Sequence, residues 1–175
     1  MVRALVHSFI ADRHRGRAIR PSMLLMSIVA IFLSAASVVA LAHFAGHVTG
    51  IWIANAVFVA ILLHYRTVDW PIIAIAGCLA NIVGDSIDYA PSMAILFAAL
   101  NFLEVATVAV PVRLFRLDRD FTRSQSLLTF YAIAVCLAPA LGAAICGAIF
   151  YKLQGMPFLQ TASEWYGADA LGLVI

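Results

Sequence analysis

The chain has 175 residues, of which 64% are hydrophobic and 11% are charged. An ordinary soluble domain carries about 25% charged residues, and a soluble domain of this size could not remove so much apolar surface from water. The composition therefore excludes a soluble globular protein and predicts an all-α, polytopic transmembrane helix bundle in a lipid bilayer. The net charge of +2 gives no indication of nucleic-acid binding, and we expect no nucleic-acid partner.

The first twenty residues form a basic tail. They contain five arginines, and Asp12 interrupts any membrane-spanning pattern, so we expect this region to lie outside the membrane. The first predicted span follows from about Pro21 to Phe44, long enough for the roughly 20 residues that a 30 Å hydrocarbon layer requires. We therefore divide the chain into a basic tail, 1–20, and a transmembrane domain, 21–175.

Two further spans are predicted in the next part of the chain. The second runs from about 51 to 65 and is short, with Trp52 near its beginning. The third opens at Trp70-Pro71, where a proline in the first helical turn does no harm, and it ends near Gly84.

An acidic loop separates the third span from the fourth. It contains Asp85 and Asp88 and no basic residue, and we expect these carboxylates to form a solvated face. The fourth predicted span runs from about Pro91 to Leu114. It is followed by a charged linker, 113–123, which is too polar to be buried.

The fifth predicted span, about 127 to 151, contains a proline and a stripe of small residues. Pro139 lies near its centre and removes one backbone donor from the helix. Ala138, Gly142 and Cys146 recur every four residues and therefore share one face. Small residues let a neighbouring helix approach closely, so we assign Gly142 to helix packing.

A sixth apolar segment begins near Trp165 and is still apolar at Ile175. We therefore predict five complete spans and the start of a sixth, and we expect the native protein to continue beyond this segment. Trp52 and Trp165 lie at span ends, as aromatic residues do at membrane interfaces, and we assign both to interface packing.

Basic residues alternate between the two sides of the predicted bundle. Ten of the eleven Lys and Arg residues lie in the tail, at Arg66 or in the linker 113–123, and the alternate loops hold only Lys152. The positive-inside rule therefore places the N-terminus, the Arg66 turn and the linker in the cytoplasm.

Strongly polar side chains within the spans favour the outer half of the predicted bundle. At a rise of about 1.5 Å per residue from the outer edge, they lie about 6 to 18 Å deep, with Asp169 at about 7 Å and Glu104 deepest. A carboxylate as deep as Glu104 costs about 2.5–3.5 kcal/mol even on a lenient scale and marks a candidate functional site. We predict a polar, ligand-binding cluster that is reachable from outside and consists of Asn55, Asn81, Asn101, Glu104 and Asp169.

Other interpretations of these residues stay open. The asparagines can serve only as interhelical hydrogen-bonding groups, and Asp169 is shallow enough to be solvated. Glu104 can be a neutral acid that donates a hydrogen bond to Asn101 or Asn81, because no span contains a Lys or Arg to hold its charge. The sequence contains no metal-binding, cofactor-binding or catalytic motif, so we expect no metal, no cofactor and no enzymatic activity.

Short motifs in the spans resemble a known family. They are Trp52-Ile-Ala-Asn55-Ala56, Trp70-Pro71, Ala80-Asn81-Ile82, Asn101-Phe-Leu-Glu104-Val105 and Trp165-Tyr-Gly-Ala-Asp169-Ala170-Leu171-Gly172. In this order and spacing, from about Gly50 to the end of the chain, they resemble the first-described type of MASE domain. This is the membrane-associated sensor domain at the N-terminus of bacterial signalling proteins.

The resemblance implies that 21–175 is a sensory input domain in the bacterial inner membrane. In the family, such a domain is normally continued by further spans and a diguanylate cyclase, phosphodiesterase or histidine kinase module. The resemblance marks seven residues as characteristic positions: Trp52, Asn55, Asn81, Asn101, Glu104, Trp165 and Asp169.

Three functions are compatible with these features. The first is a sensor that binds an uncharged or cationic small molecule, or a partner helix, from the outer side, and acts through a homodimer in the full-length protein. The second is a small transporter or channel subunit in which Glu104 relays a proton or an ion. The third is a packing partner without a ligand.

Overall fold

A computed structural model of the chain describes residues 16–45, 51–115, 117 and 124–174. Most of the predicted basic tail lies outside these residues, so the division of the chain at 20/21 stays a prediction. The described residues are almost entirely helical and form no strand, apart from one isolated bridge between Arg17 and Tyr65. The predicted all-α class is confirmed.

The described helices follow the predicted segments closely. In chain order, they are α2 (Pro21–Ala45), α3 (Ala54–His64), the 3₁₀-helix η1 (Thr67–Asp69), α4 (Trp70–Asp85), α5 (Pro91–Leu114), α6 (Ser124–Tyr131), the π-helix η2 (Ala132–Leu137), α7 (Ala138–Gln154) and α8 (Phe158–Val174).

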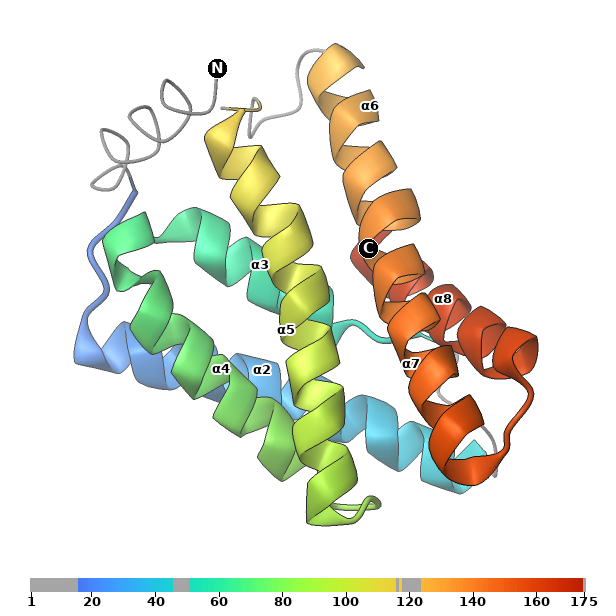
Figure 1. The fold of residues 1–175 in the computed structure, drawn as a ribbon. Helices are drawn as coiled ribbons and strands as arrows, with labels where there is room; N and C mark the ends of the chain where they lie inside the picture. Colours follow the sequence, from blue (N-terminus) through green and yellow to red (C-terminus); the bar gives the residue numbers. More distant parts are fainter. Residues whose placement is uncertain (1–15, 46–50, 116, 118–123, 175) are drawn as a thin grey trace.

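Helices α3 and α5 lie between two helix pairs (Figure 1). Helix α2 packs along α4 on one side, and α7 packs along α8 on the other. Helix α5 contacts α3, α4 and α7, while α3 also contacts α2 and α8. Residues from α3, α5, α7 and α8 can therefore meet in one interior region.

Four helical segments of the described chain are long and apolar enough to cross a membrane: Pro21–Leu41, Thr67–Asp85, Pro91–Leu114 and Ser124–Gln154. This confirms the predicted polytopic transmembrane bundle. Helix α3 has only 11 residues and is therefore about 17 Å long, less than the thickness of the hydrocarbon layer. The second predicted span is thus an apolar helix but not, by its length, a complete crossing.

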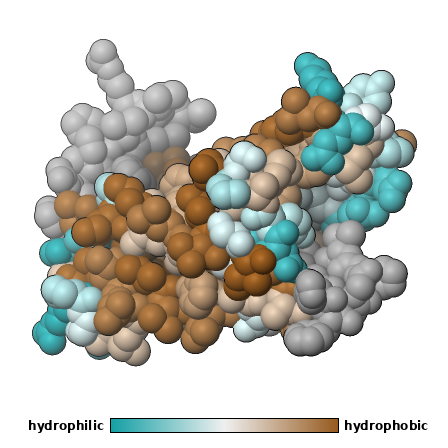
Figure 2. All heavy atoms as spheres, turned by 90° about the horizontal axis from the view of Figure 1, so that it is seen from below, coloured by the Kyte–Doolittle hydropathy of each residue, from teal (hydrophilic) through white to brown (hydrophobic). Residues whose placement is uncertain are grey.

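Large apolar side chains cover the outside of the molecule. Hydrophobic residues extend over much of the face seen in Figure 2. On α2, Leu25 and Met26 are 62% and 64% exposed, and on α4, Ile75 and Leu79 are 64% and 57% exposed. Such surfaces are unfavourable in water but suit contact with lipid chains, which agrees with a membrane-integral bundle.

The helix around Pro139 widens immediately before the proline. Helices α6, η2 and α7 follow one another without a break from Ser124 to Gln154. In η2, the helix is a π-helix, and the Ala138 N–H donates to the Ile133 carbonyl five residues earlier. A π-turn commonly accommodates an irregularity within a helix. Here it directly precedes Pro139, which has no N–H to donate to the helix.

Helix α8 begins earlier than predicted. It starts at Phe158 instead of near Trp165. Its first turns contain Gln160 and Glu164, so apolar patterning does not reveal them, but the Thr161 N–H donates to the Pro157 carbonyl and begins the helix. Consequently, α8 has 17 residues and presents both Trp165 and Asp169 from one helix.

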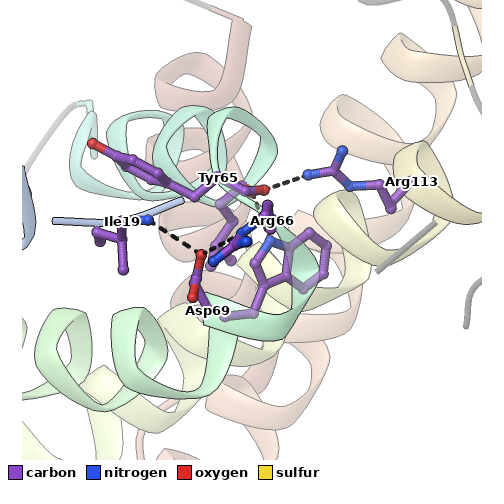
Figure 3. Close-up of polar contacts among 7 residues, drawn as sticks. Ile19, Tyr65, Arg66, Asp69 and Arg113 are labelled. Atoms are coloured by element: carbon purple, nitrogen blue, oxygen red, sulfur yellow. Dashed lines mark hydrogen bonds and ion pairs between the residues drawn. The ribbon is translucent and has the colours of Figure 1, made fainter. Parts of the chain in front are cut away.

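Arg113 does not belong to the exposed linker in which the sequence placed it. It lies in the last turn of α5 and is only 3% exposed. Its Nη2 donates to the Tyr65 carbonyl just after α3 (Figure 3) and to the Leu63 carbonyl in the last turn of α3. The Nη2 bonds satisfy carbonyls that a helix C-terminus leaves free, and the guanidinium lies 5.7 Å from the Trp70 ring, while Nε and Nη1 have no partner among the described residues.

Three basic segments meet at this end of the bundle. Arg17 pairs with the backbone of the turn after α3, accepting a hydrogen bond from the Arg66 N–H. The Asp69 carboxylate accepts from both Arg66 and the Ile19 N–H, each at 3.2 Å (Figure 3). Together with Arg113, these contacts define what we call the basic end of the bundle.

Candidate functional site

Helix α5 places the Glu104 side chain in the middle of the bundle. Glu104 is fully buried, and each of its carboxylate oxygens accepts one hydrogen bond. The Trp165 indole N–H of α8 donates to Oε1 at 2.8 Å, and the Asn55 amide of α3 donates to Oε2 at 3.1 Å. Three helices that are distant in the sequence therefore meet at one carboxyl group.

Asn55 joins a second carboxylate to the first. Its Nδ2 also donates to Asp169 Oδ1 on α8 at 3.0 Å. Asn55 is fully buried and Asp169 is 3% exposed, so neither group is solvated at the surface. We refer to Asn55, Glu104, Trp165 and Asp169 as the carboxylate cluster.

The carboxylate cluster contains two acids and no base. Among the described residues, no Lys, Arg or His forms an ion pair with Glu104 or Asp169. The ion pair between Arg66 and Asp69 lies at the basic end of the bundle. Amide and indole N–H groups are the hydrogen-bond donors to the two acids. Such buried acids in a membrane bundle are costly and point to a functional role.

Gly142 of α7 makes room for Glu104. A Cβ atom built on Gly142 would lie 1.7 Å from Glu104 Oε1, far closer than any non-bonded contact permits. The small-residue stripe of Ala138, Gly142 and Cys146 is buried. The predicted close approach is therefore observed, and at Gly142 its neighbour is the carboxylate of α5.

A cavity of about 310 Å³ lies beside the carboxylate cluster. Asp169 and Trp165 belong to its wall, together with Asn101 of α5 and Cys146 of α7. Tyr89 and Glu164, which are exposed, also line it and connect it to the molecular surface. We call it the aromatic cavity because five aromatic residues line it: Trp52, Tyr89, Phe97, Phe150 and Trp165.

The aromatic cavity lies at the end of the bundle opposite the basic end. Helix α4 runs from the turn at Asp69 to Asp85 in the cavity wall. Helix α5 runs in the other direction, from Phe97 in the wall to Arg113 at the basic end. A molecule entering the cavity thus approaches the carboxylate cluster from the end remote from the buried arginine.

Three of the five predicted ligand-binding residues come together directly, and the other two do not. Asn55, Glu104 and Asp169 share hydrogen bonds. Asn101 is 2% exposed and lines the aromatic cavity instead. Asn81 is fully buried on α4, and neither polar atom of its side chain has a partner among the described residues. The alternative in which Glu104 pairs with Asn101 or Asn81 is therefore not found, since its partners are Asn55 and Trp165.

Asp169 lies further along its helix than the predicted start near Trp165 implied. Because α8 starts at Phe158, Asp169 lies about 16 Å along the helix and is buried. The interpretation of Asp169 as a solvated interface residue does not hold, since the side chain accepts a hydrogen bond from Asn55 in the interior.

Sequence reasoning misplaced one residue of the site and did not foresee the hydrogen bond of another. It assigned Trp165 to interface packing, whereas the indole is also a donor to Glu104. It placed Asp85 on a solvated loop, whereas Asp85 ends α4, is 1% exposed and lines the aromatic cavity. The spacing of four residues from Asn81 could have indicated that Asp85 continues a buried helix face.

The mouth of the aromatic cavity has a negative electrostatic environment. Tyr89 lies in the loop between α4 and α5. Partial burial, together with the neighbouring carboxylates of Asp85 and Asp88, raises the pKa of Tyr89 above its usual value. The same carboxylates would favour a positively charged ligand over an anion.

The apolar helices enclose two carboxylates, which accept hydrogen bonds from an asparagine and a tryptophan. This arrangement defines an integral-membrane helical domain with an interior polar site. The chain belongs to the MASE1 family, whose family model matches residues 21–175, and this is a family of membrane-associated sensor domains. The resemblance inferred from the motifs is confirmed, and the match also includes the first span. No curated protein and no solved structure matches the chain.

Membership in this family gives the chain a general role. MASE1 domains are sensory input domains rather than catalytic ones, so the chain is a membrane sensor domain.

Proposed function

We propose that this domain senses a small molecule that enters the aromatic cavity and acts on the carboxylate cluster. The observation that carries the proposal is the double hydrogen bond of Asn55, which joins Glu104 of α5 to Asp169 of α8. Asp169 and Trp165 belong both to the cluster and to the cavity wall. A bound molecule would therefore touch the groups that connect α3, α5 and α8.

Signal transmission would follow from a change in these connections. A ligand shifts a conformational equilibrium only by its difference in affinity for the two states. A molecule that bonds to Asp169 or displaces Trp165 favours a packing in which α8 is released from Glu104. Helix α5 continues from Glu104 to Arg113, about 13 Å away along the axis, where Arg113 holds the end of α3. The output would then change through the geometry of a homodimer on the basic side.

We further propose that the domain lies in the bacterial inner membrane with its basic end in the cytoplasm. Arg17, Arg66 and Arg113 meet at that end, as the positive-inside rule requires. The aromatic cavity then opens toward the periplasmic side.

A labelling experiment tests this orientation. Single cysteines introduced at Tyr89 and at Val68, which are both exposed, in a variant whose three native cysteines are replaced, are treated with a membrane-impermeant maleimide in intact spheroplasts. We expect labelling at position 89 and none at position 68 until the membrane is opened, because the two positions lie near opposite ends of α4. The reverse pattern would contradict the proposed orientation.

Replacement of Asn101 by Ala tests the ligand site. Asn101 lines the aromatic cavity but forms no hydrogen bond to the carboxylate cluster, so the fold should remain intact. We expect any cavity ligand that contacts this amide to bind about tenfold more weakly, as the loss of one buried hydrogen bond predicts. The measurement is the ligand-induced shift of the unfolding midpoint in nanodiscs, over a panel of small neutral and cationic compounds.

Asn81→Ala is the matched control for this experiment. Asn81 is equally buried but does not line the cavity. If Asn81→Ala weakens binding as much as Asn101→Ala, or if no compound stabilises the native protein, the cavity is not the sensory site.

One observation favours a second candidate function, a proton or cation transporter. Glu104 and Asp169 share a single amide donor without a basic partner among the described residues, and neighbouring buried acids can pass a proton between them. Transport should produce a flux in proteoliposomes that is lost in Glu104→Gln. A sensor domain should bind its ligand without such a flux.

A further inference from the structure

We propose that the aromatic cavity selects a small organic cation, an amine in its ammonium form or a quaternary ammonium ion, that also carries an oxygen acceptor. This inference rests on the proposed sensory function and specifies its ligand class. Four features of the cavity support it: the charge of its lining, its aromatic rings, its buried polar atoms without a hydrogen-bond partner, and its size.

The charge of the cavity wall is one-sided. Asp85, Glu164 and Asp169 all line it, and no Lys, Arg or His does among the described residues. Glu164 is exposed at the rim, while Asp85 and Asp169 are buried deeper. A cation would therefore meet acidic side chains from the rim to the interior, whereas an anion would meet no basic side chain in the described lining.

Aromatic rings give the cavity faces for an ammonium group. Phe97 lies at the centre of the aromatic lining, with ring centroids 5.0 Å from Tyr89, 5.5 Å from Trp165 and 6.1 Å from Phe150. Tyr89 meets Phe97 at 89°, whereas Phe150 stacks on it at 7°. Rings at such different inclinations, combined with carboxylates, are the means by which proteins recognise ammonium ligands.

Two residues that line the cavity each carry a buried polar atom without a partner among the described residues. Asp85 Oδ2 has no donor, although the residue is 1% exposed, and Trp52 Nε1 has no acceptor, although the residue is 8% exposed. Buried polar groups are almost always satisfied. An ammonium group would complement the carboxylate of Asp85, and a hydroxyl or carbonyl oxygen on the same molecule would accept from Trp52.

The size and lining of the cavity favour an organic ion over a metal ion. Its volume of about 310 Å³ lies at the small end of the range for ligand pockets. No group of three or more His, Cys, Asp or Glu side chains among the described residues could hold a metal ion. The three carboxylates are therefore too dispersed for coordination, but they suit a cation several atoms wide.

The experiment compares two ligands of the same shape and different charge. Choline is a quaternary ammonium ion with a hydroxyl group, and 3,3-dimethylbutan-1-ol is its neutral isostere. Both are titrated into the full chain in nanodiscs, and the unfolding midpoint and tryptophan fluorescence are recorded. We expect choline to bind at least about tenfold more tightly than the neutral alcohol, and tetramethylammonium, which lacks the hydroxyl, to bind with intermediate affinity.

Matched variants locate the effect in the cavity. Asp85→Asn and Phe97→Leu should each weaken choline binding by about tenfold. Asp88→Asn should weaken it much less, because Asp88 is exposed and does not line the cavity. The unfolding midpoint without ligand shows whether each variant folds, and Phe97→Leu, which keeps an apolar side chain, guards against a folding defect in Asp85→Asn.

The outcomes separate this inference from the sensory function itself. Equal binding of choline and its neutral isostere, or no binding of either ammonium probe, overturns the choice of an organic cation. The sensory function survives that result if another compound stabilises the native protein and loses this effect in Asn101→Ala. Binding of choline that is unaffected by both Asp85→Asn and Phe97→Leu would also overturn the inference, because the ion would then bind elsewhere.

Discussion

Asn55→Ala is expected to destabilise the domain more than any other single asparagine replacement. The substitution removes both interhelical hydrogen bonds of Asn55, to Glu104 and to Asp169, and leaves two buried acids without that donor. Each interhelical hydrogen bond in a membrane is worth about 0.6–2 kcal/mol, so the unfolding free energy should fall by about 1–4 kcal/mol. Denaturation in bicelles measures this change.

The control for Asn55→Ala is Asn81→Ala. Both side chains are fully buried, but neither polar atom of Asn81 has a partner among the described residues. Its replacement therefore removes no hydrogen bond within them and should cost much less. An equal loss of stability in the two variants would show that the amide bridge does not stabilise the bundle.

A double-mutant cycle with Asp169→Asn isolates the bridge. Because Asn55 donates to Asp169, the effects of Asn55→Ala and Asp169→Asn should not add. Additive effects would mean that the two side chains do not interact.

Gly142→Ala is expected to force α7 away from α5. The new methyl group would lie 1.7 Å from Glu104 Oε1, so either the helices separate or Glu104 leaves its hydrogen bonds to Trp165 and Asn55. Overpacking of this kind typically costs about 1–3 kcal/mol. The loss should appear as a lower unfolding midpoint in nanodiscs.

The matched control for this substitution is Gly167→Ala in α8. A Cβ atom on Gly167 would meet nothing within 4 Å. Alanine is the better helix former by about 1 kcal/mol, so this variant should be neutral or slightly stabilised. In the double variant Gly142→Ala/Glu104→Ala the collision no longer exists, and stability should not fall below that of Glu104→Ala alone. A further loss there would show that Gly142 matters for another reason.

Much of the architecture followed from the sequence because a bilayer restricts the chain to apolar helices. The boundaries of α4 and α5 were predicted to within a residue or two, since Trp70-Pro71 and Pro91 mark their starts. The beginning of α8 was missed, because its first two turns contain Gln160 and Glu164 and carry no apolar pattern. Arg113 was misplaced for a related reason: composition identifies a charged residue but not the helix end whose carbonyls it can satisfy.

The candidate site was predicted only in part. The cost of placing a carboxylate or amide within an apolar span indicated Asn55, Glu104 and Asp169 from the sequence. Their partners were not predictable in the same way. Helical periodicity gives the residues that share a face of one helix, but it does not say which helices face each other. The sequence could therefore offer only Asn101, three residues away, or Asn81, on the preceding helix, as possible partners of Glu104.

The sequence by itself determined that this protein is a membrane-integral helical domain of the sensor type, with acids and amides buried in its spans. Composition and the order of the motifs suffice for that, because both can be obtained from the sequence without knowing which helices are in contact. Only the tertiary structure decided that Asn55 bridges two carboxylates, that Gly142 makes room for one of them, and that Asp85 lines an aromatic cavity. The physical reason is that these contacts join helices distant in the chain, and their packing selects the partners.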